Sequence, residues 1–426
     1  MRSKLFLGGL SLIATVPPVS SQELSLEDAV RKAVSWHPSI DEAIGRLNQQ
    51  AERINEAKSG YMPRVEGGLS TSYGNRDEGF QPVLNLSASQ MIYDFGKVSS
   101  AVDSATAGTQ GTRARVLLAV DQLVRETSYS AIELQRNRAL RAVAREQISG
   151  ITAITDLVRE RTEKGASTRS DQVQAEARLE EAVSAELQIS SQLDRWAGSL
   201  ANLTGQSGAI NMSSKAPKWL LKACDSAKPE WEELPEVQEA DASRRVALAE
   251  LDRSRAEALP TLSLEARTGL YLNGDSSRDH DMRLGFNLSS SIYQGGAASA
   301  RRNAAGHALR AADAAKNNAR IEVQRRLSEA SLQTSGLTRL LSSLSNRGKM
   351  MKETRDLYRE QYIQLGTRTL LDLLNAEQEL HQANFEAVNT VHDLRRLRID
   401  CVFNTGKSRT LFGLEGMSVR GVSLRK

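Results

Sequence analysis

The chain has 426 residues, of which 25% are charged and only 4% are aromatic. So few large side chains cannot fill thick globular cores, whereas long helices packed in twos and threes need fewer of them. The formal net charge of +4 provides no basic field, which excludes nucleic acid as a partner.

Residues 1–21 have the pattern of a secretory signal peptide. Arg2 and Lys4 precede the apolar run 5–16, and the small residues at 19–21 match a cleavage site. We therefore expect the mature chain outside the cytoplasm. No later stretch of about 18 apolar residues could form a transmembrane helix. The mature chain is then either soluble in an extracytoplasmic space or crosses a membrane as β-strands.

The first structural repeat, 22–204, opens with a helical pair over 24–60. This pair is broken at His37-Pro38, because the residue before a proline is disfavoured in a helix. Apolar and polar residues then alternate over the hairpin 62–94, as they do over a second hairpin, 260–294. Each strand has roughly 10 residues or more, which is enough for a tilted strand to span a bilayer.

Four strands are too few to close on themselves, because small barrels begin at about 8 strands. Other copies of the chain must then meet the open edges, giving about 8, 12 or 16 strands for two, three or four protomers. The alternative is a soluble four-stranded sheet packed on the helices. The signal peptide and the length of the strands favour the membrane.

Long stretches with helical spacing and no breaker except isolated glycines predict four helices, over 97–164, 168–204, 297–364 and 369–404. The last of them carries a strict seven-residue stripe: Leu373, Leu380, Ala387, Leu394 and Cys401. Such spacing predicts left-handed supercoiling against neighbouring helices. A free-standing coiled-coil rod would explain these helices, but it leaves the two hairpins unexplained.

Cys224 and Cys401 are the only cysteines. They could pair in an oxidising compartment, but the sequence does not place their Cα atoms. Because Cys401 lies on the apolar stripe, a buried thiol is the favoured interpretation.

The chain is an internal duplication. Tyr93 and Tyr293 are 293 − 93 = 200 positions apart, and Gly165 and Gly366 are 366 − 165 = 201 apart. The second structural repeat, 235–406, contains a helix, the second hairpin and two long helices. A linker, 205–234, joins the copies, and we expect Trp219 and Trp231 to anchor it. The tail 407–426 resembles neither copy.

The turns between the paired helices have matching signals. Gly165 and Gly366 are predicted to end one helix in a left-handed conformation. Thr168 with Asp171, and Thr369 with Asp372, have the spacing of capping boxes at the start of the next helix.

These turns and the strand-to-helix junctions carry a family resemblance. The most specific stretch is 366–377, with a looser partner over 165–176, and the segments 93–96 and 293–296 are typical junctions, with Tyr93, Gly96, Tyr293 and Gly296 at their ends. Over nearly all of 24–406 the chain resembles the TolC-type outer-membrane efflux and secretion channel-tunnel family.

The resemblance implies a mainly α fold with a β-barrel portion. In a homotrimer each chain would give four strands to a 12-stranded transmembrane β-barrel in the lipid of the cell outer membrane. The long helices would continue as an α-helical barrel, a coiled-coil tunnel in the periplasm. There a periplasmic adaptor (membrane fusion) protein would connect it to an inner-membrane ABC transporter or other pump.

The resemblance also implies a closable aperture at the helix tips. Asp372 matches a lumen-facing acidic ring, and Arg368 matches a basic residue whose acidic partner would be Asp171. Asn375 stands where some members carry a second aspartate. Tyr362 lies one position away from the family's tyrosine, so no role is transferred to it. Both aspartates are also explained as helix caps alone.

The exposed tip residues Gly165, Gly366 and Thr367 are the candidates for contact with the adaptor. By the resemblance, the chain is a passive exit duct. No lipid-bearing cysteine stands at the cleavage point, which favours type I protein secretion over small-molecule or multidrug efflux. A soluble periplasmic coiled-coil scaffold is the remaining alternative.

No catalytic residue, cofactor or metal site is expected, so the chain is not predicted to be an enzyme. Its five histidines are scattered without His-Glu-x-x-His spacing, and neither a metal-binding cysteine pair nor a phosphate-binding glycine loop occurs.

Overall fold

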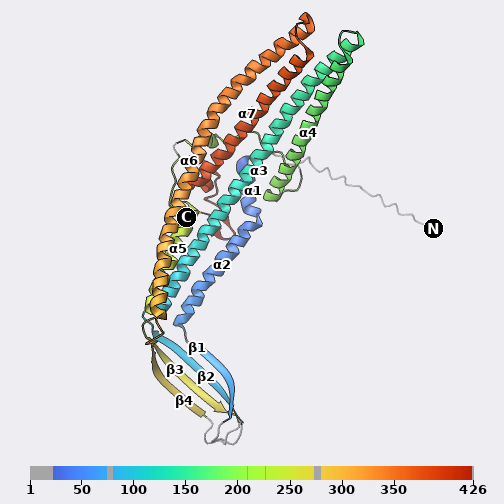
Figure 1. Cartoon of the computed structure of the whole chain (residues 1–426). Coiled ribbons are helices and arrows are strands. Elements are labelled where there is room, and N and C mark those ends of the chain that lie inside the picture. The colour runs from blue at the N-terminus through green and yellow to red at the C-terminus, as the bar shows by residue number, and fades with distance from the viewer. Residues whose placement is uncertain (1–22, 74–79, 209, 226, 273–279, 425–426) are drawn as a thin grey trace, which may run out of the picture.

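The computed structural model describes residues 23–73, 80–208, 210–225, 227–272 and 280–424. The expected signal peptide, 1–21, lies outside the described residues. A layer of long helices makes up most of the molecule, and a four-stranded sheet lies at one end of it (Figure 1).

Two helices run through most of the length of the layer. They are α3, with 67 residues, and α6, with 64 residues, so at about 1.5 Å per residue each extends roughly 100 Å. The principal helices are α1 (Leu26–Trp36), α2 (Pro38–Lys58), α3 (Lys97–Glu163), α4 (Arg169–Thr204), α5 (Pro235–Ala256), α6 (Ala297–Glu360) and α7 (Leu370–Thr405). None of the helices in the described ranges combines the length and apolarity of a membrane span.

The two repeats interleave in space. Far from the sheet, α6 packs on α7, α7 on α3, and α3 on α4. Nearer the sheet, α6 packs on α5, α5 on α3, and α3 on α2 (Figure 1). The layer therefore has α6 along one edge and α4 and α2 along the other.

The sheet has the order β1-β2-β3-β4, with every neighbouring pair antiparallel. Its strands are β1 (Arg64–Tyr73), β2 (Phe80–Tyr93), β3 (Thr261–Tyr271) and β4 (His280–Ser289). Leu84 lies opposite both Leu69 and Leu270 in the register, so one face collects the apolar residues. Asn85 and Glu265 lie on the other, polar face, which confirms the predicted alternation.

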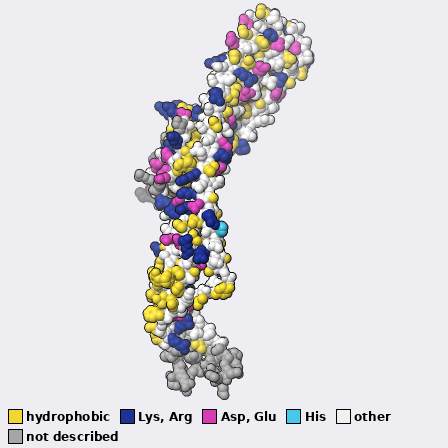
Figure 2. Space-filling model, turned by 60° about the vertical axis from the view of Figure 1, so that its left-hand side comes forward, with side chains coloured by type: hydrophobic (Ala, Val, Ile, Leu, Met, Phe, Trp, Pro, Cys, Tyr) yellow, Lys and Arg dark blue, Asp and Glu magenta, His cyan; other side chains and the backbone are white. Residues whose placement is uncertain are grey.

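The exposed apolar side chains of the sheet are conspicuous. Figure 2 shows hydrophobic side chains gathered toward the lower end of the visible face, while charged side chains are spread over the helical part. On β4, Phe286 is 74% exposed and Leu284 is 68% exposed. A single chain does not bury this face.

The last strand is shorter than the sequence predicted. The hairpin was expected to reach 294, but β4 ends at Ser289, opposite Thr261, the first residue of β3. Residues 290–293 therefore have no strand of their own chain to pair with. β2 continues to Tyr93 because β3 still pairs with it there, after a register shift.

The tail, which matches neither repeat, belongs to the largest hydrophobic core. It forms α8 (Ser408–Leu411) and a two-stranded ribbon of β5 (Ser418–Val419) and β6 (Val422–Ser423). Its buried Phe412 packs edge-on against Trp219 of the linker, with ring centroids 5.1 Å apart. The Trp219 Nε1–H donates to Glu27 at 3.2 Å. Linker, tail and α1 therefore form one unit against α3.

Cys224 and Cys401 form a disulfide, with their Cα atoms 5.3 Å apart. The expectation of a buried thiol at Cys401 was wrong. The stripe correctly placed Cys401 in an apolar environment, but the linker passes over this part of α7 and brings Cys224 beside it. A separation of 177 residues gives no sign of that approach.

Candidate functional site

The helical hairpins α3–α4 and α6–α7 end together at the pole opposite the sheet (Figure 1). Gly165 and Gly366 turn them, with φ of +73° and +61°. A Cβ at either position would meet open space, so the backbone conformation and not packing requires glycine.

Both expected capping boxes are present. The Asp171 amide donates to Thr168 Oγ1 at 3.1 Å, and the Thr168 amide donates back to Asp171 Oδ2 at 3.1 Å. The equivalent bonds between Asp372 and Thr369 measure 3.2 Å and 3.1 Å. The backbone N–H of each threonine is the main cause that holds the pKa of the paired aspartate below its ordinary value. Each aspartate is therefore an ionised helix cap.

Arg368 contacts its own hairpin. Its Nε donates to Gln361 Oε1 at 3.1 Å, and its guanidinium lies 4.2 Å from the centre of the Tyr358 ring. The Asp171 carboxylate accepts from Ser167 and Thr168. The expected pair of Arg368 with Asp171 is thus not formed among the described residues of one chain, because each group is already engaged within its own hairpin.

Tyr362, to which the sequence assigned no role, joins the two hairpins. The guanidinium of Arg161 on α3 lies 4.9 Å from the centre of the Tyr362 ring and donates to the Tyr362 carbonyl at 3.4 Å. Tyr362 is buried with Leu373 and Val158 in a cluster that spans both tips. Arg161 and Tyr362 are 362 − 161 = 201 positions apart, so they are equivalent residues of the two repeats.

A buried charged group, also missed from the sequence, lies further along α7. Arg355 Nη1 is 3.1 Å from Glu377 Oε2, and His381 Nε2 is 2.9 Å from Glu377 Oε1. Burial raises the pKa of Glu377, but the hydrogen bond to His381 and the charge of Arg355 outweigh it, so the pKa lies below its ordinary value. A side chain at Gly150 of α3 would collide with this carboxylate. The group therefore fills the space where α3, α6 and α7 pack together.

The remaining tip candidates lie at the surface. Asn375 is exposed one turn after Asp372 on α7. Thr367 is exposed, and its amide donates to the Gln361 carbonyl at 3.3 Å, where a π-helical turn, Gln361–Leu365, replaces the end of the expected helix. This turn is a difference in backbone conformation between the two tips.

The strand-to-helix junctions lie at the opposite end of the layer. Gly96 and Gly296, with φ of +97° and +84°, are the N-cap residues of α3 and α6. In the first junction the Asp94 carboxylate accepts the amides of Gly96 and Val98 at 2.9 Å and 2.6 Å. Tyr93 is exposed there, as Tyr293 is in the second junction. Both are positioned at the boundary between sheet and helices.

Among the described residues, no group of three or more His, Cys, Asp or Glu side chains is arranged to hold a metal ion. The structure has a sheet with open edges and one apolar face at one end. Its long helices have exposed apolar side chains along the edges of the layer, and its capped tips are joined by a buried cluster and the Arg161–Tyr362 contact. These features define the class: a protomer of a membrane channel that continues into a helical tunnel.

A family model described as outer membrane efflux protein matches residues 29–206 and 231–396, and the chain belongs to this family of TolC-type outer-membrane efflux channels. The channels of this family are non-enzymatic components of tripartite systems and extend a helical tunnel into the periplasm. The outer-membrane location excludes the soluble scaffold considered from the sequence.

The outer membrane protein VceC of Vibrio cholerae has the same fold, with a TM-score of 0.78 at 17% identity, covering 89% of this chain and 96% of that one. The outer-membrane channel OprN has a TM-score of 0.77 at 18% identity and covers 90% of each chain. For the CmeC outer membrane channel of Campylobacter jejuni the TM-score is 0.76 at 16% identity, with 90% and 86% covered. No match was found among curated proteins.

Proposed function

We propose that three copies of this chain form the outer-membrane exit duct of a tripartite export system. The observation that carries the proposal is the sheet with two open edges. Because each strand runs antiparallel to the next, β4 runs antiparallel to β1, so β4 of one copy can pair with β1 of the next copy. Three chains then give 3 × 4 = 12 strands, the number that the family resemblance implies.

The two faces of the sheet support this assembly. The apolar face, with Leu69, Leu86 and Phe286, is exposed in one chain and fits contact with lipid. The polar face would line the duct. There Asn287 and Arg267 both donate to Glu265, at 2.7 Å and 2.9 Å.

The edges of the helical layer support the same ring. On α6, Leu332 is 74% exposed and Ile321 is 66% exposed, and on α4 Leu187 is 62% exposed. Large apolar side chains on helix edges are stabilised when a neighbour covers them. A ring in which β4 meets the next β1 brings α6 of one copy toward α4 and α2 of the next.

Native mass spectrometry of detergent-solubilised protein tests the assembly, and planar bilayers test the duct. We expect three copies per particle and discrete ion-conducting pores. Monomers that stay monomeric in several detergents, or verified trimers that remain silent even after Asp372→Asn, would contradict the proposal.

The tips would be the periplasmic entrance. We propose that Gly165, Gly366 and Thr367 present the turns to the adaptor protein, and that Asp372 and Arg368 lie around the aperture. Asn375, next to Asp372, adds no charge, so a ring of Asp372 would bind cations weakly. The contact between Arg161 and Tyr362 would hold the two hairpins together in the closed state.

For the cargo we propose protein, exported by an inner-membrane ABC transporter as in type I secretion. The preference comes from the sequence alone: residues 19–21 are Val-Ser-Ser and include no cysteine of the kind that the family resemblance associates with acylated efflux members. Deletion of the gene separates this cargo from the alternative of small molecules. Loss of one secreted protein with unchanged drug sensitivity is expected, and drug sensitivity with secretion intact would reverse the assignment.

A further inference from the structure

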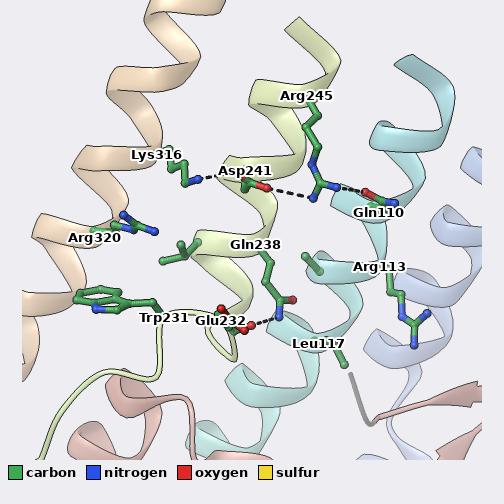
Figure 3. Close-up of a pocket in the computed structure, with 12 residues that line it drawn as sticks. Gln110, Arg113, Leu117, Trp231, Glu232, Gln238, Asp241, Arg245, Lys316 and Arg320 are labelled. Atoms are coloured by element: carbon green, nitrogen blue, oxygen red, sulfur yellow. Dashed lines mark hydrogen bonds and ion pairs between the residues drawn. The ribbon is translucent and has the colours of Figure 1, made fainter. Parts of the chain in front are cut away.

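A pocket of about 640 Å³ lies between α3, α5 and α6, at the end of the linker and away from the tips (Figure 3). That volume is typical of small-molecule sites. Its floor includes the buried side chains of Leu117 and Val237, and the half-buried Trp231 forms the wall beside α6.

Cationic side chains outnumber carboxylates around this pocket. Asp241 of α5 accepts from Lys316 of α6 at 2.6 Å and pairs with Arg245 at 3.1 Å, and Arg245 also donates to Gln110 of α3 at 2.6 Å (Figure 3). This chain of contacts crosses all three helices. It fixes the Lys316 ammonium and the Arg245 guanidinium at the rim of the pocket. The single carboxylate of Asp241 neutralises only one of these two positive charges.

Arg320 is the cation that the pocket leaves available. No carboxylate in the described part of the chain lies within ion-pair distance of it, and its guanidinium is 5.9 Å from the centre of the Trp231 ring. Figure 3 shows the two side chains beside each other at the α6 side of the pocket. A guanidinium offers a planar set of donors that matches carboxylate, phosphate or sulfonate oxygens, and an indole offers a flat apolar surface.

We propose that this pocket binds a small anionic molecule with a flat apolar body. The anionic group lies at Arg320, with Lys316 and Arg245 nearby, and the apolar body lies against Trp231 and the floor formed by Leu117 and Val237. A passive duct needs no such site, so the inference goes beyond the export function and does not depend on the cargo.

Calorimetric titration of the full-length, detergent-solubilised protein with naphthalene-2-sulfonate tests the proposal, with a protein-free micelle blank. We expect one site per chain. Arg320→Gln should weaken binding by about tenfold or more, because a charge-assisted hydrogen bond is lost. Arg320→Lys should lose less, since it keeps the charge but not the planar donors. Arg310→Gln, on the same helix but outside the pocket, is the matched control and should bind normally.

Two further probes test the two halves of the ligand. Neutral 2-naphthol lacks the charge, and sulfate lacks the apolar body, so each should bind at least about tenfold more weakly. Equal affinity of Arg320→Gln and the unchanged protein would overturn the proposal. So would equal loss in the Arg310→Gln control, or binding of either single-feature probe as tight as that of naphthalene-2-sulfonate.

Discussion

The hairpins α3–α4 and α6–α7 descend from one duplicated unit, yet their tips present different surfaces. Both turn at a glycine with positive φ, and both begin the second helix with a threonine-aspartate capping box. Around Gly366, however, Ile363, Leu365 and Leu371 are exposed. With the 201-residue offset, their equivalents around Gly165 are Thr162, Lys164 and Ser170.

The buried sides of the hairpins differ as well. The Glu377 side chain on α7 is only 2% exposed and pairs with Arg355 and His381. Its equivalent on α4, Glu176, is 40% exposed and lies 3.8 Å from Arg159. The two hairpins share the turn glycine and the capping box that the backbone conformation requires. They differ in the side chains that are exposed at the tip and buried behind it. We propose that both tips face the adaptor but that α6–α7, with exposed apolar side chains at its tip and the buried Glu377 behind it, provides more of the contact than α3–α4 does.

The largest expected effect comes from removing the buried carboxylate. Glu377→Ala should lower the free energy of unfolding by about 3 kcal/mol, because the buried His381 and the partly buried Arg355 lose the carboxylate that they share, and Arg355 keeps only the exposed Asp356. Glu176→Ala, the equivalent surface change, should cost less than about 1 kcal/mol. Thermal unfolding followed by circular dichroism measures both. Equal losses of unfolding free energy in the two variants would contradict the proposed difference between the hairpins.

Adaptor binding should depend on one tip more than on the other. Leu365→Asp should reduce cross-linking to the adaptor about tenfold, since an apolar contact is replaced by a buried charge. Lys164→Asp, at the equivalent position of the α3–α4 tip, should reduce it much less. The opposite order would assign adaptor binding to α3–α4.

The contact that joins the tips should affect the resting state of the pore. Arg161→Ala removes the guanidinium from Tyr362 and should raise resting conductance about two- to fivefold, as expected for a cation–π contact of about 0.5–1 kcal/mol. Single-channel recording measures the change. Arg159→Ala is the control and should leave conductance unchanged, because it removes ion pairs to Asp156 and Glu176 within the α3–α4 hairpin and none to α6–α7.

The capping boxes should behave alike. Thr168→Ala and Thr369→Ala should each cost about 1 kcal/mol in the first turn of α4 and α7. Hydrogen exchange of peptides covering those turns reports the loss, with Thr367→Ala as a control outside either box. A large difference between the two would show that the tips differ in backbone stability as well as in surface.

The smallest effect concerns pH. The pKa of Asp372 is lowered from 3.8 in the folded chain, mainly by the Thr369 amide. Its capping contribution is therefore fully present above that value and is lost as the pH falls through the folded pKa. A spin label introduced by Thr367→Cys should show constant mobility from neutral pH to pH 5 and greater mobility only below pH 3.8. In an Asp372→Asn background the added mobility should already be present at neutral pH.

Features read from local patterns were predicted well. Strand alternation, both capping boxes and the two turn glycines follow from the conformations that residues allow and from the bonds that near neighbours can make. The end of β4 at Ser289 was not predicted, because a strand ends where its partner ends and the sequence of β4 does not contain that information.

The sequence by itself determined a duplicated chain of long helices and two amphipathic hairpins, because periodicity and spacing express local physics. Tertiary structure alone brought Cys224 to Cys401, placed Tyr362 against Arg161, and buried Glu377 opposite Gly150. These pairings join segments that are far apart along the chain. Their partners are set by how helices of the two repeats interleave, and no spacing within either repeat records that arrangement.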